Sequence, residues 1–128
     1  MRDMAQEWIR AAEDDIAAIC VMINDDNLTN IIAFHAQQAV EKSLKAIIEA
    51  RGEAIPRKHD LLLLYSKVSE SVHIEDESIL DTLNQLYTEA RYPSELGLLP
   101  HGKPTRADAK IIADFAKDVV NKVKKVLS

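Results

Sequence analysis

The chain has 128 residues, of which 47% are hydrophobic and 5% aromatic, and its formal net charge at pH 7 is −5. This length predicts one domain, residues 1–128, while the acidic balance argues against broad, nonspecific nucleic-acid binding but leaves room for a local basic patch. A single cysteine rules out an internal disulfide, no Cys/His spacing resembles a zinc site, and no apolar run reaches the roughly 18 residues of a membrane-spanning helix.

The N-terminal residues show an amphipathic helical pattern and not that of a signal peptide, so we expect a cytoplasmic protein. The first helix is predicted from about Asp3 to Ile23, with an apolar stripe at steps of three and four residues: Trp8, Ala12, Ile16, Ile19 and Ile23. Asp15 lies near the centre of this stripe, whereas Asp14 points away. Cys20 lies at the edge of the stripe and is expected to be a small core residue.

A long second helix is predicted to begin near Thr29 or Asn30, either of which suits an N-cap. It continues to about Arg51 and ends before Gly52, the residue type that most often takes the left-handed conformation after a helix. One face of this helix is apolar: Ala33, Val40, Leu44 and Ile47.

Two polar residues, Gln37 and Glu41, lie inside the apolar arc of this second helix. A buried carboxylate must find a cation or several donors, or else it takes up a proton. Lys45 is one further four-residue step along, in the favourable order for an ion pair with Glu41. His35 and Lys42 fall on the opposite face, and we expect His35 to be an ordinary surface residue.

A basic loop follows the second helix, with Arg57, Lys58 and His59 in consecutive positions. Asp60 has the side chain of an N-cap for a third helix, Leu61 to about Glu70. Because this helix starts with four consecutive leucines, it is expected to be enclosed by neighbouring elements.

A fourth helix is predicted from about Glu77 to Arg91, because Pro93 keeps the residue before it out of the helical region. Arg91 would then lie in the last turn, where a cation complements the helix dipole. The inward residues are expected to be Ile79, Leu83, Leu86, Tyr87 and Ala90.

Residues 92–104 are rich in proline and glycine and predict a structured loop. Thr105 and Asp108 have the spacing of a capping box and would start the last helix, from Arg106 to about Leu127. Its inner face is expected to hold Ile111, Phe115, Val119, Val123 and Val126. The elements together predict an all-α bundle of about five helices.

Three stretches of the chain carry a family resemblance: residues 34–46, Phe-His-Ala-Gln-Gln-Ala-Val-Glu-Lys-Ser-Leu-Lys-Ala; residues 59–61, His-Asp-Leu; and residues 90–93, Ala-Arg-Tyr-Pro. In order and spacing they resemble the HEPN family, the higher eukaryotes and prokaryotes nucleotide-binding domain. The resemblance implies an antiparallel up-and-down helical bundle, usually a homodimer. Many members are encoded beside a small nucleotidyltransferase as a toxin–antitoxin-like pair, and others are ribonucleases.

The ribonuclease members carry an arginine and, after four to six residues, a histidine late in the domain. Here the only histidine after Arg91 is His101, ten positions further on. The nuclease motif is therefore not carried over, and catalytic residues stay unassigned. The resemblance does carry over Arg91, Tyr92 and Pro93 as the equivalent helix end, facing the block from Gln37 to Lys45.

The polar residues allow more than one interpretation. Glu41 with Gln37 either fixes helix packing or faces a ligand. Arg91 either satisfies groups at a helix end or binds a phosphate, for which its planar fork is suited. His59 either lies in a solvated loop or joins Glu41 and Arg91 in one polar pocket, where an imidazole acts as acid or base. Asp15 is expected to pair with a cation of that same network: Lys45, His59 or Arg91.

Three functions remain open: a binding module that partners a small nucleotidyltransferase, a ribonuclease toxin using Arg91 with His59 or His101, and a purely structural dimerising bundle. The candidate residues for binding a nucleotide or RNA phosphate are Gln37, Glu41, Lys45, His59, Arg91 and Tyr92. The sequence indicates no cofactor and no metal site.

Overall fold

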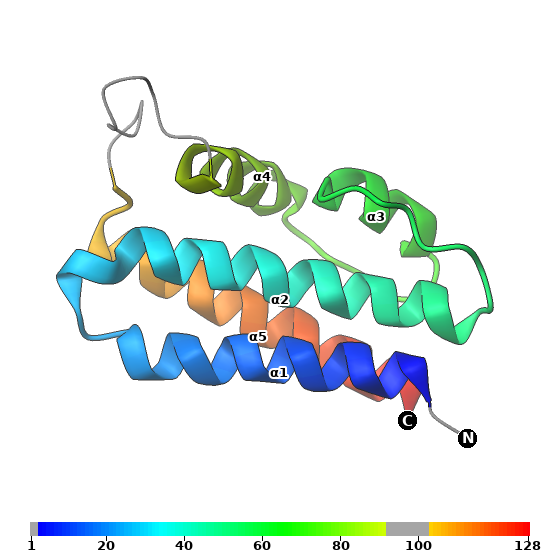
Figure 1. Ribbon diagram of the computed structural model, residues 1–128. Coiled ribbons are helices and arrows are strands. Elements are labelled where there is room, and N and C mark those ends of the chain that lie inside the picture. Colours follow the sequence, from blue (N-terminus) through cyan, green and yellow to red (C-terminus); the bar gives the residue numbers. More distant parts are fainter. Residues whose placement is uncertain (1–2, 92–102) are drawn as a thin grey trace.

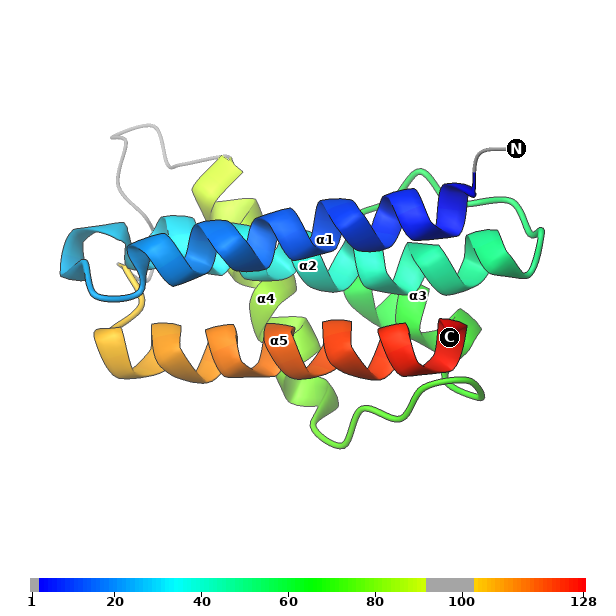
Figure 2. The same cartoon turned by 90° about the horizontal axis from the view of Figure 1, so that it is seen from below.

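The long second helix lies at the centre of the fold and packs against each of the other four helices. The computed structural model describes residues 3–91 and 103–128, with the backbone alone at 89–91. Helices α1 (Met4–Met22) and α5 (Arg106–Leu127) run along one side of α2 (Thr29–Ala50). Helices α3 (Leu61–Val68) and α4 (Glu77–Arg91) cover its other side, and α4 crosses the direction of α2 (Figures 1 and 2). The predicted all-α bundle is confirmed.

The helix starts follow the side chains that can accept hydrogen bonds from free backbone N–H groups. Asp3 accepts from Ala5 and Gln6 at the start of α1, and Asp60 accepts from Leu62 and Leu63 at the start of α3. Thr105 and Asp108 form the predicted capping box of α5. At the end of α2, Gly52 has a φ of 73°, as predicted for a left-handed residue.

The prediction that Thr29 or Asn30 caps α2 is wrong. A short 3₁₀ helix, η1 (Asp26–Leu28), precedes α2 and leads directly into it, with Asp25 as its own cap. Leu28 is the residue before α2, and no side chain caps that helix. The segment after α1, which the sequence pattern predicts to be a turn, therefore already contains a helical turn before α2 begins.

The core is built from α2 and the inner faces of its four neighbours, and three predictions about those faces need correction. On α5, Ile111 is 57% exposed and Val126 42%, because the small side chains of Ala109, Ala113 and Ala116 bring a different face of that helix against α2. Cys20 is exposed, since it lies beyond the edge of the face that α1 buries. Leu62 is exposed because α3 is covered on one side only, by α2 and α4.

On α4, Leu83 and Tyr87 are buried as predicted, and Leu80 joins them, while Ile79 and Leu86 are half-buried. The side chain of Ala90 and the loop at 92–102 lie outside the described residues. No helix in the described ranges has the length and apolar character needed to cross a membrane.

Candidate ligand-binding site around His59

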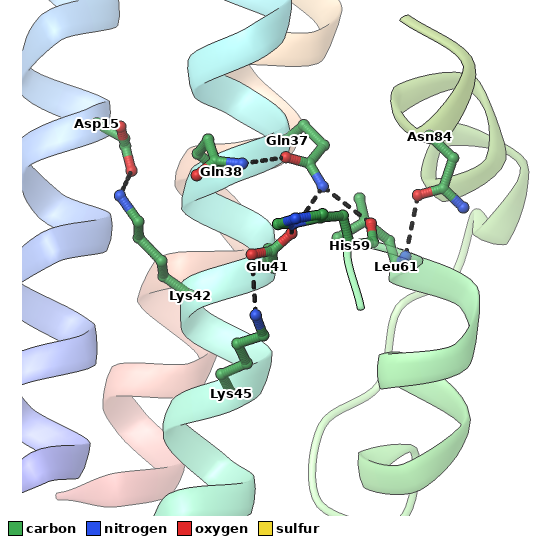
Figure 3. Close-up of polar contacts among 9 residues, drawn as sticks. All are labelled: Asp15, Gln37, Gln38, Glu41, Lys42, Lys45, His59, Leu61 and Asn84. Atoms are coloured by element: carbon green, nitrogen blue, oxygen red, sulfur yellow. Dashed lines mark hydrogen bonds and ion pairs between the residues drawn. The ribbon is translucent and has the colours of Figure 1, made fainter. Parts of the chain in front are cut away.

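A buried carboxylate, that of Glu41, lies in the middle of α2 and is satisfied by three neighbours (Figure 3). Its side chain is 5% exposed. Oε1 accepts a hydrogen bond from Gln37 Nε2 at 3.1 Å and lies 2.9 Å from His59 Nδ1, while Oε2 accepts from Lys45 Nζ at 3.0 Å. The carboxylate thus has the cation and the donors that its burial demands. Glu41 is therefore buried as predicted, and of the two positions that the sequence left open for His59, the structure shows the one beside Glu41.

His59 is held on several sides, although its own side chain is 53% exposed. Gln37 Nε2 also donates to the carbonyl oxygen of His59 at 3.1 Å. The imidazole lies against the ring of Tyr87, with 5.2 Å between centroids, and Tyr87 stacks in turn on Phe34. With Nδ1 directed at Glu41, the second ring nitrogen, Nε2, has no partner in the described part of the chain. The result is a half-exposed imidazole that contacts Glu41 through one nitrogen and Tyr87 through its ring.

The loop that carries His59 is also fixed where it enters α3. Asn84 on α4 accepts from the backbone N–H of Leu61 through Oδ1 at 2.9 Å (Figure 3). Its Nδ2 donates to Asp60 Oδ1, also at 2.9 Å. The sequence pattern alone does not predict a role for Asn84. The available signal was a polar residue directly after Leu83 and three before Tyr87, on the edge of the predicted inner face of α4.

The other two candidates on α2 face the interior and not solvent. Gln37 is fully buried, and the side chain of Lys45 is 9% exposed, with its Nζ 5.6 Å from the centre of the Trp8 ring. These residues can set the position and charge of Glu41 and His59 but leave little surface for a ligand to touch. Of the six candidates, His59 is the one whose side chain the structure describes as open.

The remaining two candidates come from the end of α4. That helix ends at Arg91, as predicted, but the side chain of Arg91 and all of Tyr92 lie outside the described residues, as does His101. Whether Arg91 approaches Glu41 or His59 therefore stays a prediction. Arg57 and Lys58 are exposed beside His59 and add positive charge to its loop.

A second buried acid, Asp15 on α1, has a cluster of its own. Its Oδ2 accepts from Lys42 Nζ at 2.8 Å, and its Oδ1 lies 2.8 Å from His35 Nδ1. These two residues take the place of the predicted Lys45 and His59, while the side chain of the third predicted partner, Arg91, lies outside the described residues. His35 is not an ordinary surface residue, since its side chain is only 30% exposed. The reason is the central place of α2: the face opposite the core stripe meets α1 instead of water. No group of three or more acidic, histidine or cysteine side chains in the described ranges could hold a metal ion.

A helical bundle organised around one long helix with an internal acid, and a histidine-bearing loop beside it, is the arrangement expected of a HEPN domain. The HEPN domain model matches residues 5–126, and the chain belongs to this family.

The chain resembles three further proteins along nearly its whole length. A protein of Methanocaldococcus jannaschii named "Putative toxin MJ1304" is 28% identical to this chain over an alignment of 135 residues. The alignment covers 96% of this chain and 88% of that protein. The crystal structure of TT1696 from Thermus thermophilus superimposes with a TM-score of 0.78 and 25% identity, covering 98% of this chain and 99% of the other. ST0689, an archaeal HEPN homologue, has a TM-score of 0.70 and 24% identity over the full length of both chains, a likeness of fold alone.

Proposed function

We propose that this HEPN-domain chain binds a phosphate group of a nucleotide or RNA at the His59 loop, and that it partners a small nucleotidyltransferase in a toxin–antitoxin-like pair. The observation that carries the binding proposal is an exposed imidazole that a buried carboxylate fixes through Nδ1 and that two exposed cations precede in the chain. A histidine held in this way presents its other nitrogen to a ligand in one orientation.

The local balance of charge supports an anionic ligand. Glu41 is neutralised inside the protein by the Lys45 ammonium 3.0 Å away, so its charge does not oppose an anion at the surface. Arg57 and Lys58, the two residues before His59, are exposed and have no ion-pair partners in the described part of the chain. A phosphate can accept hydrogen bonds from the two cations and, when the imidazole is protonated, from its Nε2–H as well. This local patch is compatible with the overall acidic charge, which disfavours only broad binding of nucleic acid.

The binding proposal predicts that His59→Ala weakens the complex by about tenfold, the cost of one charge-assisted hydrogen bond. The measurement is isothermal titration calorimetry with ATP, GTP and a short single-stranded RNA at one fixed salt concentration. The matched control is His73→Ala, which removes an exposed imidazole elsewhere and should leave affinity unchanged. The binding proposal is wrong if the wild type gives no heat with any of the three ligands, or if His59→Ala binds as tightly as the wild type.

The pairing proposal rests on membership of the family and on the toxin name of the archaeal relative. We propose that the chain acts as a homodimer in the cytoplasm and that its partner is encoded beside it. Coexpression with a neighbouring reading frame that carries a Gly-Ser and paired-Asp nucleotidyltransferase signature should give a complex that stays together in size-exclusion chromatography. Separate elution of the two chains would count against the pairing without touching phosphate binding.

A ribonuclease toxin is the second candidate, favoured by the contact of 2.9 Å between His59 Nδ1 and Glu41 Oε1. A carboxylate that orients a histidine is a common support for acid–base chemistry. If this chain cleaves RNA with a noncanonical Arg/His pair, Arg91→Ala should abolish both growth inhibition and cleavage of a labelled RNA. His59→Ala should do the same, while His73→Ala should not. Cleavage that persists in Arg91→Ala would remove this candidate and leave phosphate binding untouched.

A further inference from the structure

Asn84 connects α4 to the segment that carries His59 through two hydrogen bonds in opposite directions. Its Oδ1 accepts from the backbone N–H of Leu61, and its Nδ2 donates to the side chain of Asp60, both at 2.9 Å. The same Asp60 oxygen caps α3 by accepting from Leu62 N at 3.0 Å and Leu63 N at 3.3 Å. One amide thus ties the first turn of α3 to the middle of α4.

These bonds restrict the main chain immediately after His59, while α2 restricts His59 itself. Gln37 holds the carbonyl oxygen of His59, and Glu41 holds its imidazole. Asp60 is the single residue that links His59 to the start of α3, and its side chain accepts a hydrogen bond from Asn84. Without the Asn84 amide, the loop keeps its hydrogen bonds to α2 but loses those to α4, so it can shift relative to Tyr87, on which the imidazole rests.

We propose that Asn84 is a positioning residue for His59, acting through Asp60 and Leu61. It directs Nδ1 of the imidazole at Glu41 and leaves Nε2 available outside. Its effect on ligand affinity rests on the proposed function, whereas its effect on the orientation of the imidazole does not. Arg91 is seven residues further along α4, two helical turns or roughly 10 Å, so the same amide also sets the spacing between His59 and the end of that helix.

The test uses the tautomer of the His59 imidazole, read from long-range ¹H–¹⁵N NMR spectra at a pH where the ring is neutral. In the wild type the hydrogen bond to Glu41 should hold the proton on Nδ1. In Asn84→Ala the signal should move toward the Nε2–H form that a free imidazole favours. Alanine is a better helix former than asparagine, so α4 should stay folded. Gln85→Ala, at the next position on α4, is the matched control and should keep the wild-type signal.

An exchange of the two side chains separates positioning from a general loss of stability. Asn84→Asp places two carboxylates together and should disturb the tautomer as Asn84→Ala does. The double variant Asp60→Asn/Asn84→Asp keeps the net charge and restores every hydrogen bond: the new amide caps α3 and donates to the new carboxylate, which accepts from Leu61. We expect it to recover the wild-type signal.

At a lower pH, where the imidazole is protonated and Nε2–H can donate to a phosphate, the same variants should change phosphate affinity in parallel, with about a fivefold loss in Asn84→Ala and recovery in the exchanged pair. An unchanged tautomer in folded Asn84→Ala would overturn the proposal, and so would a failure of the exchanged pair to recover the wild-type signal. If ATP, GTP and RNA all fail to bind the wild type, the proposed function falls, but the NMR signal still decides the role of Asn84.

Discussion

Replacing Glu41 by alanine is expected to lower the free energy of unfolding by about 3–5 kcal/mol, the typical cost of breaking a buried ion pair from one side. The substitution leaves the Lys45 ammonium in a site where its side chain is only 9% exposed. It also removes the acceptor shared by Gln37 and His59. Of these three partners, His59 can turn to water because it is half exposed, but Lys45 cannot do so without leaving its place beside Trp8.

The measurement is the urea denaturation midpoint followed by circular dichroism, with two comparison proteins. The double variant Glu41→Met/Lys45→Met removes both charges together and should lose less than half as much stability as Glu41→Ala, because no charge is left without a partner. Glu13→Ala removes an acid whose pair with Lys124 is about half exposed and should change stability by no more than about 0.5 kcal/mol. A midpoint unchanged in Glu41→Ala would mean that Lys45 finds another partner or reaches solvent.

The centre of this polar cluster could be predicted from sequence because its members repeat every four residues on one helix. Gln37, Glu41 and Lys45 occupy successive turns of α2, and a carboxylate within an apolar arc requires donors. The partner that the loop after α2 supplies is His59, whose Nδ1 lies 2.9 Å from Glu41 Oε1. Asn84 escaped prediction because its two bonds join positions 23 and 24 residues away, and no periodicity along one helix reveals such a contact.

The helix boundaries were more predictable than the sides on which the helices pack. Prolines and capping side chains act locally, so α4 and α5 have the predicted bounds. Burial depends on the shape of the neighbouring helix: on α5 it is the alanines that allow close approach to α2, and Ile111 is left exposed. A sequence pattern assigns the inner face of a helix from its large apolar side chains, whereas small side chains determine how closely two helices can pack.

The central position of α2 explains why the partners of Asp15 were predicted wrongly. A single helical wheel assigns one face to the core and the opposite face to water. Here both faces are covered, by α3 and α4 on one side and by α1 on the other. Lys42 and His35 therefore lie where a wheel predicts solvent, and each has an oxygen of Asp15 within 2.8 Å. Asp15 on α1 and Glu41 on α2 have similar surroundings, since each carboxylate contacts one lysine and one histidine. The two clusters lie on different sides of α2.

Replacing Asp15 by alanine is expected to lower the free energy of unfolding by about 2 kcal/mol, less than the loss at Glu41. Asp15 is 7% exposed, and its carboxylate is the acceptor for both Lys42 and His35. The side chains of these partners are 24% and 30% exposed, so both can move toward water once the acid is gone. The remaining cost is the lost hydrogen bonds and the gap left between α1 and α2.

Urea denaturation of Asp15→Ala, Lys42→Ala and the double variant forms a cycle that isolates the contact between the two charges. A coupling free energy of about 1 kcal/mol is expected, because neighbouring charged residues in contact do not act additively. Asp14→Ala is the matched control: Asp14 is the next residue, it is exposed, and its loss should change stability by no more than about 0.5 kcal/mol. Additive effects of the two substitutions would mean that the contact between Lys42 and Asp15 adds nothing to the free energy of unfolding. His35 would then be the partner that stabilises the buried carboxylate of Asp15.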